Sequence, residues 1–136
     1  MKNKQYGLIG FPLSHSFSKK YFTEKFAKEG IKNCEYELFE IEHIENFWKL
    51  VEPKIPQLKG LNVTIPHKQD VMAFLDELDE VAEEIGAVNV IKISEDGILK
   101  GYNSDYYGFK NSLEKFVGAD LSKVKALVLG TGGASK

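Results

Sequence analysis

The chain has 136 residues, of which 43% are apolar and 28% are charged, a composition typical of a globular protein with one compact domain. Its net charge of −2 excludes strong electrostatic attraction to nucleic acid or to an anionic membrane. Cys34 is the only cysteine, which excludes a disulfide framework and a cysteine-based metal site, and we expect no metal. Residues 1–4 lack a signal-peptide core and no apolar run reaches membrane-spanning length, so we expect a cytoplasmic protein.

The first 65 residues alternate between the hydrophobic patterns of strands and helices. Tyr21, Phe22 and Phe26 fall on one face of a helix, and Gly30 is placed to end that helix. Pro53 ends a second, shorter helix. The expected elements are a strand at 5–10, a helix at 17–29, a strand at 35–41, a helix at 43–51 and a strand at 58–65.

Pro66 begins the next expected element, because proline fits the first position of a helix. We expect helical turns from Pro66 to about Ile85, ended by Gly86. Asp96-Gly97 is a hairpin signal, since glycine adopts the positive φ that a tight turn requires. The remaining expected elements are a strand at 87–93, its hairpin partner at 98–102, a helix at 104–116 capped by Asn103-Ser104, and a strand at 125–129.

This alternation predicts an α/β fold, a three-layer sandwich with a mostly parallel sheet that includes an antiparallel strand. After the last expected strand the chain reads Gly130-Thr131-Gly132-Gly133-Ala134-Ser135, a loop of the kind that opens a phosphate-binding βα unit. It is not a P-loop, because Ser135 stands where a glycine is required before Lys136. We therefore expect the first strand of a Rossmann-type domain at this end of the chain.

Two charged residues follow the carboxyl ends of expected strands, where α/β proteins bind their ligands. Lys68 falls in the first turn of an expected helix, where the helix dipole disfavours a cation. It therefore either extends into water or has a chemical task. Asp105 falls in the first turn of another helix, where the dipole favours an acid, so it either compensates the dipole or belongs to a site.

Four polar residues lie near the same sheet edge, and three of them have two interpretations. Ser14 and Ser16 flank a histidine after a Pro-Leu turn and suit a small anion such as a carboxylate, but serines here also cap helices. Asn89 lies in an expected strand, where asparagine is depleted, so its amide either binds a ligand or braces a loop. Thr64 stands at the end of a buried strand, on the loop that leads to Lys68.

Taken together, four motifs resemble the substrate-binding domain of the shikimate dehydrogenase family. They occur in the order and approximate spacing of that family, and the match covers essentially the whole chain. Each motif alone is a weak signal, whereas the ordered set is specific. The motifs are Pro12-Leu13-Ser14-His15-Ser16, Asn62-Val63-Thr64-Ile65-Pro66-His67-Lys68, Gly86-Ala87-Val88-Asn89 and Asn103-Ser104-Asp105-Tyr106-Tyr107-Gly108.

The resemblance implies an NADP-linked, reversible reduction of 3-dehydroshikimate to shikimate, on the pathway to chorismate and the aromatic amino acids. It implies that Lys68 and Asp105 are the catalytic pair and also touch the substrate. By the same resemblance, Ser14 and Ser16 hold the substrate's carboxylate. The residues that it assigns to the ring hydroxyls are Thr64, Asn89 and Asp105.

The resemblance also implies a division of the chain into three parts. Residues 1–103 form the substrate-binding domain, 104–123 a connecting helix and linker, and 124–136 the first strand and diphosphate loop of a truncated NADP-binding domain. We therefore expect this chain to be inactive without the cofactor domain. The cofactor-binding residues implied are Gly130, Thr131, Gly132, Gly133 and Ala134.

Two alternatives to a dedicated shikimate dehydrogenase stay open at this point. One is a quinate/shikimate dehydrogenase, and the other is a stand-alone shikimate-binding domain without redox chemistry. In each case the partner is a small molecule rather than nucleic acid or a membrane. The resemblance is compatible with a monomer or a homodimer.

Overall fold

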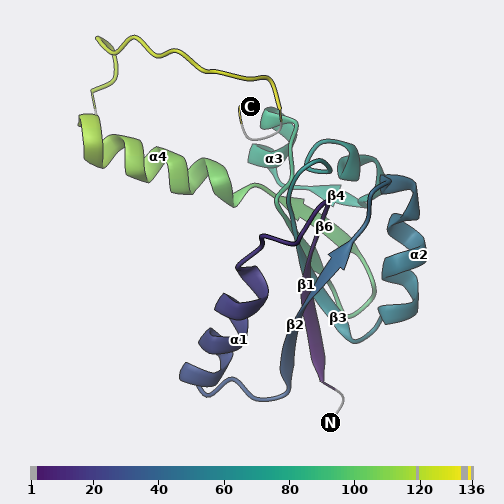
Figure 1. Ribbon diagram of the computed structural model, residues 1–136. Coiled ribbons are helices and arrows are strands. Elements are labelled where there is room, and N and C mark those ends of the chain that lie inside the picture. Colours follow the sequence, from purple (N-terminus) through teal and green to yellow (C-terminus); the bar gives the residue numbers. More distant parts are fainter. Residues whose placement is uncertain (1–2, 119, 133–134, 136) are drawn as a thin grey trace.

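The computed structural model describes residues 3–118, 120–132 and 135. Strands and helices alternate along most of the chain, as the hydrophobic pattern predicts (Figure 1). The elements, with η marking a 3-10 helix, are β1 (Lys4–Gly10), α1 (Ser18–Lys28), β2 (Cys34–Glu40), η1 (Ile44–Asn46), α2 (Phe47–Val51), η2 (Glu52–Lys54), β3 (Leu58–Val63), η3 (Asp70–Phe74), β4 (Glu77–Leu78), α3 (Glu80–Ile85), β5 (Val90–Ile93), β6 (Leu99–Tyr102) and α4 (Ser104–Val117).

The strands form one sheet in the order β2-β1-β3-β5-β6-β4. Strand β5 is antiparallel to its neighbours β3 and β6, while β1 is parallel to β2 and β3, and β4 is parallel to β6. The expected mostly parallel sheet with an antiparallel strand is therefore confirmed. Because β5 runs in the opposite direction, its amino end lies at the edge where β1, β3 and β6 have their carboxyl ends. We call this edge the carboxyl edge.

Helices cover the two faces of the sheet and complete the expected three-layer sandwich (Figure 1). Side chains of successive strand residues point to opposite faces, so the neighbours Leu8 and Ile9 belong to different cores. The core on the α1 face is small and joins Leu8 to Tyr36 and Phe22. The larger core on the α2 face contains Ile9, Ile41, Phe47, Val51, Leu58, Leu61, Val63, Val71, Ala82, Val88, Ile91, Ile93 and Leu99.

The helical turns expected from Pro66 to Ile85 are wrong in part. The chain instead forms a turn at 65–69 with a cis Ile65–Pro66 bond, then η3, the short strand β4 and α3. Strand β4 exists because this segment pairs with β6: the Asp76 N–H donates to the Leu99 carbonyl at 3.0 Å. Pairing with a distant strand therefore overrides the local helical pattern. The expected stop at Gly86 is confirmed by its φ of 72° at the end of α3.

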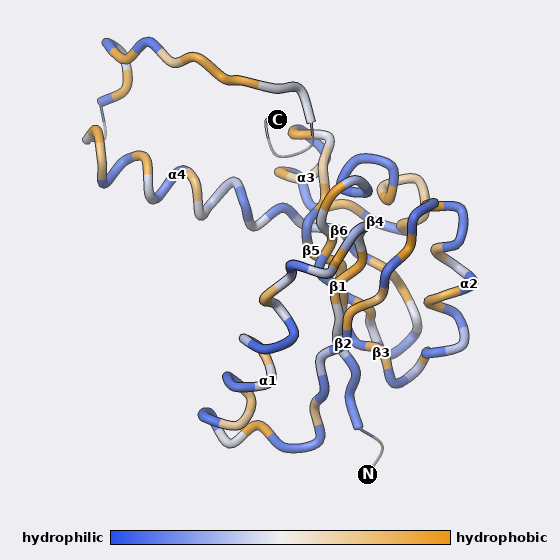
Figure 2. The backbone as a smooth tube through the Cα atoms, in the orientation of Figure 1, coloured by the Kyte–Doolittle hydropathy of each residue, from blue (hydrophilic) through white to orange (hydrophobic). Residues whose placement is uncertain are grey.

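Helix α4 extends away from the sheet, and an extended arm follows it (Figure 1). The strand expected at 125–129 does not form, although Figure 2 shows that this part of the arm is hydrophobic. Leu127 and Leu129 are 84% and 87% exposed. A strand needs a neighbour for its backbone hydrogen bonds, and among the described residues none is paired with this segment. None of the helices in the described ranges combines the length and apolarity that crossing a membrane requires.

Candidate active site

Backbone hydrogen bonds hold three segments together at the carboxyl edge: the loop after β1, the turn after β3 and the residues before β5. The Phe11 N–H after β1 donates to the Ile65 carbonyl after β3 at 3.0 Å. Gly10 permits this approach, because a Cβ atom there would lie 2.4 Å from the Thr64 Cγ2 atom. The Val88 N–H before β5 donates to the Lys68 carbonyl at 2.7 Å. The segments that carry these residues after β1, after β3 and before β5 therefore lie together at one edge, as expected.

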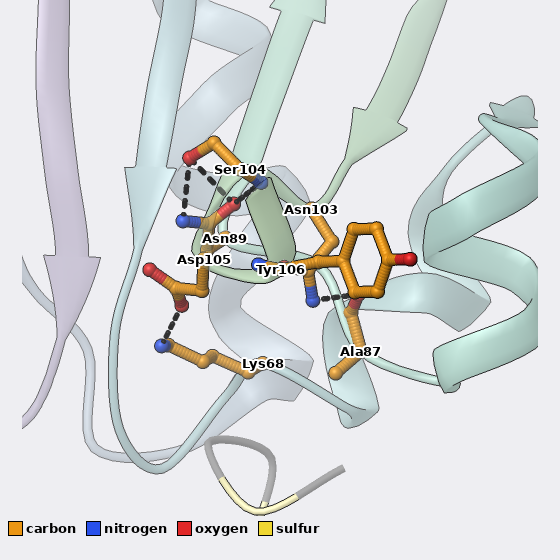
Figure 3. Close-up of polar contacts among 7 residues, drawn as sticks. All are labelled: Lys68, Ala87, Asn89, Asn103, Ser104, Asp105 and Tyr106. Atoms are coloured by element: carbon orange, nitrogen blue, oxygen red, sulfur yellow. Dashed lines mark hydrogen bonds and ion pairs between the residues drawn. The ribbon is translucent and has the colours of Figure 1, made fainter. Parts of the chain in front are cut away.

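Lys68 and Asp105 form an ion pair at this edge (Figure 3). The Lys68 Nζ atom donates to Asp105 Oδ2 at 2.6 Å. The Lys68 side chain is 14% exposed, whereas that of Asp105 is 53% exposed. Asp105 lies in the first turn of α4 as expected, but Lys68 lies in the 65–69 turn rather than in a helix. The expected opposition between Lys68 and a helix dipole is therefore wrong. The ion pair uses one carboxylate oxygen of Asp105, and no hydrogen bond from the described residues occupies the other, which can accept from a ligand hydroxyl.

Asn89 is buried and bracketed by Ser104 (Figure 3). Its Oδ1 atom accepts from the Ser104 N–H at 2.8 Å, and its Nδ2 atom donates to Ser104 Oγ at 2.9 Å. These contacts fix the orientation of the amide and leave its second N–H available. Asn89 therefore braces the start of α4 and can still donate to a ligand. The role of Ser104 was missed by the sequence reasoning, which assigned this residue only to the helix cap.

The loop that carries Ser14 and Ser16 is held by a carboxylate. Glu40 Oε1, at the end of β2, accepts from the Leu13 N–H at 2.6 Å. Ser14 is exposed, while Ser16 Oγ accepts from the Ser18 N–H at 3.3 Å at the start of α1. The N-cap position of α1 is Phe17, without a side-chain capping bond, so Ser16 contacts the start of the helix from one position before the cap. The O–H of Ser16 remains a donor. Nothing in the sequence indicated the contribution of Glu40, because its partner is a backbone N–H.

A further polar residue next to the site was missed. Asn62 lies two positions before Thr64 and accepts from the Tyr36 O–H at 2.7 Å. Both Asn62 and Tyr36 line a cavity of about 530 Å³ on the α1 face of the sheet. Burial raises the pKa of Tyr36 well above its ordinary value. An asparagine within a strand is itself unusual. This signal applies to Asn62, which lies in β3, whereas the expected strand position of Asn89 is wrong because β5 begins only at Val90.

The glycine-rich loop is described only in part. Gly133 and Ala134 lie outside the described residues. Gly130 has φ 117°, a conformation that favours glycine, and the Ser135 N–H donates to the Gly132 carbonyl at 2.9 Å. The described residues Gly130, Thr131 and Gly132 are exposed, and their backbone N–H groups can donate to a diphosphate. In the described part of the chain, no group of three or more histidine, cysteine or acidic side chains is arranged to hold a metal.

Comparison with known proteins places this geometry in a family. The family model for the shikimate dehydrogenase substrate binding domain matches residues 8–91. The chain belongs to that family. It is 50% identical over 132 residues to the shikimate dehydrogenase (NADP(+)) of Clostridium beijerinckii, covering 96% of the chain and 47% of that relative. The chain therefore spans about half the length of the curated relatives it matches.

Solved structures agree with this assignment. A shikimate dehydrogenase in complex with NADP+ superimposes with a TM-score of 0.81 at 40% identity, covering 98% of the chain and 45% of that protein. The Thermus thermophilus enzyme in complex with shikimate gives a TM-score of 0.82 at 32% identity, covering 97% of the chain and 49% of that protein. The substrate-binding domain fold expected from the four motifs is therefore confirmed.

Proposed function

We propose that the chain is the substrate-binding half of an NADP-dependent shikimate dehydrogenase, which reversibly reduces 3-dehydroshikimate to shikimate. The observation that carries this proposal is the Lys68–Asp105 ion pair at the carboxyl edge. This edge is where α/β folds bind ligands, and the matched relatives are named for this activity. Their greater length supports a division of labour in which further chain supplies the cofactor domain.

Lys68 is the proposed acid–base group. Its ammonium group donates a hydrogen bond and carries a positive charge, so it can polarise the substrate's C3 carbonyl and stabilise the oxygen as negative charge develops. It then delivers the proton that this oxygen requires. Asp105 orients the ammonium group through the 2.6 Å contact. In the direction of oxidation, the same nitrogen receives the proton from the C3 hydroxyl.

The neighbouring polar side chains suit a small polyhydroxylated acid. Ser14 and Ser16 stand on one loop and can both donate to a carboxylate. The free N–H of Asn89, the hydroxyl of Thr64 and the free oxygen of Asp105 can bond ring hydroxyls. Sites of this kind discriminate strongly, because a ligand that lacks a hydroxyl leaves a buried polar group without a partner.

The glycine-rich loop is the proposed contact to the cofactor's diphosphate. Its residues Gly130, Thr131 and Gly132 fit that task because they can bring backbone N–H groups close to an anion. NADPH, when bound, supplies the hydride that reduces C3. Gly133 and Ala134 complete the proposed loop. A cytoplasmic location and a monomeric or dimeric state stay predictions.

Turnover in the full-length enzyme tests the proposal. Reduction of 3-dehydroshikimate is followed by the loss of NADPH absorbance, with NADH as the alternative cofactor and quinate oxidation as the alternative reaction. The proposal predicts activity with 3-dehydroshikimate and NADPH that exceeds both alternatives. A full-length protein that is folded and binds NADPH, yet leaves 3-dehydroshikimate unreduced, contradicts the proposal.

A further inference from the structure

Asn103 uses both ends of its side-chain amide, and only one of these contacts is a helix cap. Its Oδ1 atom accepts from the Tyr106 N–H at 3.1 Å, which is the capping bond of α4. Its Nδ2 atom donates to the Ala87 carbonyl at 3.0 Å (Figure 3). Asn103 is 4% exposed and Ala87 is fully buried. The bond to Ala87 is therefore shielded from competing water, whereas the bond to Tyr106 is partly buried.

The Ala87 carbonyl and the Val88 N–H belong to the same planar peptide group. The carbonyl accepts from Asn103, and the N–H donates to the Lys68 carbonyl at 2.7 Å. One rigid peptide group therefore connects the first turn of α4, which carries Asp105, to the backbone of Lys68. The connection acts on a turn that is also held by the buried His67, whose Nε2 atom lies 2.6 Å from the Ile41 carbonyl oxygen.

We propose that Asn103 is a positioning residue that sets Asp105 against Lys68 through the Ala87–Val88 peptide group. Among the described residues, no side-chain hydrogen bond joins Asn103 to either member of the ion pair. A helix cap needs only an acceptor oxygen, whereas this bridge also needs a donor that reaches Ala87. Asparagine supplies both from two separate atoms, whereas aspartate supplies only acceptors, and serine has one shorter hydroxyl whose oxygen is already used by the cap.

Variants at Asn103 separate the two tasks. Asn103→Asp keeps the capping oxygen and has no donor for Ala87. Asn103→Ser keeps the capping oxygen but replaces the amide N–H by a shorter hydroxyl, and Asn103→Ala loses both contacts. Asp79→Ala is the matched control, because Asp79 caps α3 by accepting from the Val81 N–H at 3.2 Å and α3 carries no proposed site residue. The control measures the effect of a lost cap alone.

Amide hydrogen exchange in the 136-residue chain tests the bridge without any assay of function. In Asn103→Ser, we expect the Val88 amide to exchange at least about tenfold faster than in the wild type, while the Tyr106 amide stays protected. In Asp79→Ala, the exchange rates of the Val88 and Tyr106 amides should change only as much as those of core amides such as that of Ile9. Unchanged exchange at Val88 in Asn103→Ser overturns the bridge.

Kinetics in the full-length enzyme test the consequence, and this part rests on the proposed function. Small misplacements of catalytic groups cost large factors in rate, so we expect kcat to fall roughly tenfold or more in Asn103→Ser and Asn103→Asp, measured at a temperature where circular dichroism shows both variants to be folded. Asp79→Ala should lose stability and keep kcat. Wild-type kcat in both Asn103 variants overturns the positioning role. If the wild-type enzyme shows no turnover, the proposed function fails, and the exchange data still decide the bridge.

Discussion

Lys68 and Asp105 are 37 residues apart in the sequence, and their Nζ and Oδ2 atoms lie 2.6 Å apart. The contact joins the turn after β3 to the first turn of α4. It exists because β3 and β6 end at the same edge of the sheet, with the reversed strand β5 between them. The topology of the sheet thus determines where the proposed chemistry takes place.

Replacing Lys68 by alanine should remove most turnover in the full-length enzyme and leave shikimate binding largely intact. Loss of a general acid–base group costs roughly 10²–10⁴-fold in rate. Stopped-flow or steady-state kcat values check this expectation. Lys25→Ala is the control, since it also removes a 2.6 Å ion pair, to Glu29, from a helix outside the site. A Lys68→Ala enzyme that keeps half of its turnover rules out the acid–base role.

Ser14→Ala and Ser16→Ala should each weaken shikimate binding by roughly 1–3 kcal/mol, because a carboxylate loses a hydrogen-bond donor. Calorimetric affinities measure both changes. The structure predicts a difference between them: Ser16→Ala should also lower the free energy of unfolding by about 0.5–1 kcal/mol, because Ser16 accepts from the Ser18 N–H. Equal affinity of both variants and the wild type would restrict these serines to a structural role.

Tyr36→Phe should destabilise the chain by about 1–2 kcal/mol, because Asn62 loses its buried partner. Tyr107→Phe, at a tyrosine that is 51% exposed, should have little effect. Urea unfolding followed by circular dichroism compares the two variants. An equal loss in both would contradict the importance of the Tyr36–Asn62 bond.

The same hydroxyl gives a pH dependence with a defined sign. Burial raises the pKa of Tyr36 in the folded state, while an unfolded tyrosine ionises near about pH 10. The unfolded state therefore releases the proton first, and the stabilising contribution of Tyr36 is complete below about pH 10 and declines as the pH rises further. Unfolding free energies between pH 8 and about 11 should fall less steeply in Tyr36→Phe. If the unfolding free energies of the wild type and Tyr36→Phe fall in parallel with pH, Tyr36 does not cause the loss of stability.

Removing residues 120–136 should leave the thermal midpoint nearly unchanged. Leu127, Val128 and Leu129 are mostly exposed, and none of the described residues of the arm belongs to the sheet. A 1 kcal/mol loss would lower the midpoint of a domain this size by about 4 °C, which differential scanning calorimetry resolves easily. A decrease of that size or more would mean that the arm packs on the domain.

The sequence predicted the elements whose pattern is local. The strand at 5–10, the helix at 17–29 and the turn at Gly97 all form, the last with φ 84°. Segments that depend on a distant partner were predicted less well. Strand β4 requires β6 and replaces part of an expected helix, and the segment 125–129 has the composition of a strand but no described neighbour.

The candidate site also has features that the sequence predicts and features that depend on the fold. Lys68 and Asp105 could be placed at one edge from the order of the strands, because the carboxyl ends of parallel strands coincide. The two hydrogen bonds between Asn89 and Ser104 could not be predicted from the sequence, because the orientation of an amide depends on the packing around it. The same holds for the second contact of Asn103: its capping bond is a local signal, whereas its bond to Ala87 requires the fold.

Titration of the 136-residue chain with shikimate by calorimetry tests the central claim most directly, with Asp105→Ala alongside. The account predicts saturable binding that weakens in Asp105→Ala, since the free oxygen of Asp105 bonds a ring hydroxyl. Asp120→Ala, in the arm beyond α4, should bind as the wild type does. Binding by all three proteins with one affinity, or no binding by a wild-type chain that circular dichroism shows to be folded, would contradict a preformed shikimate site around Lys68 and Asp105.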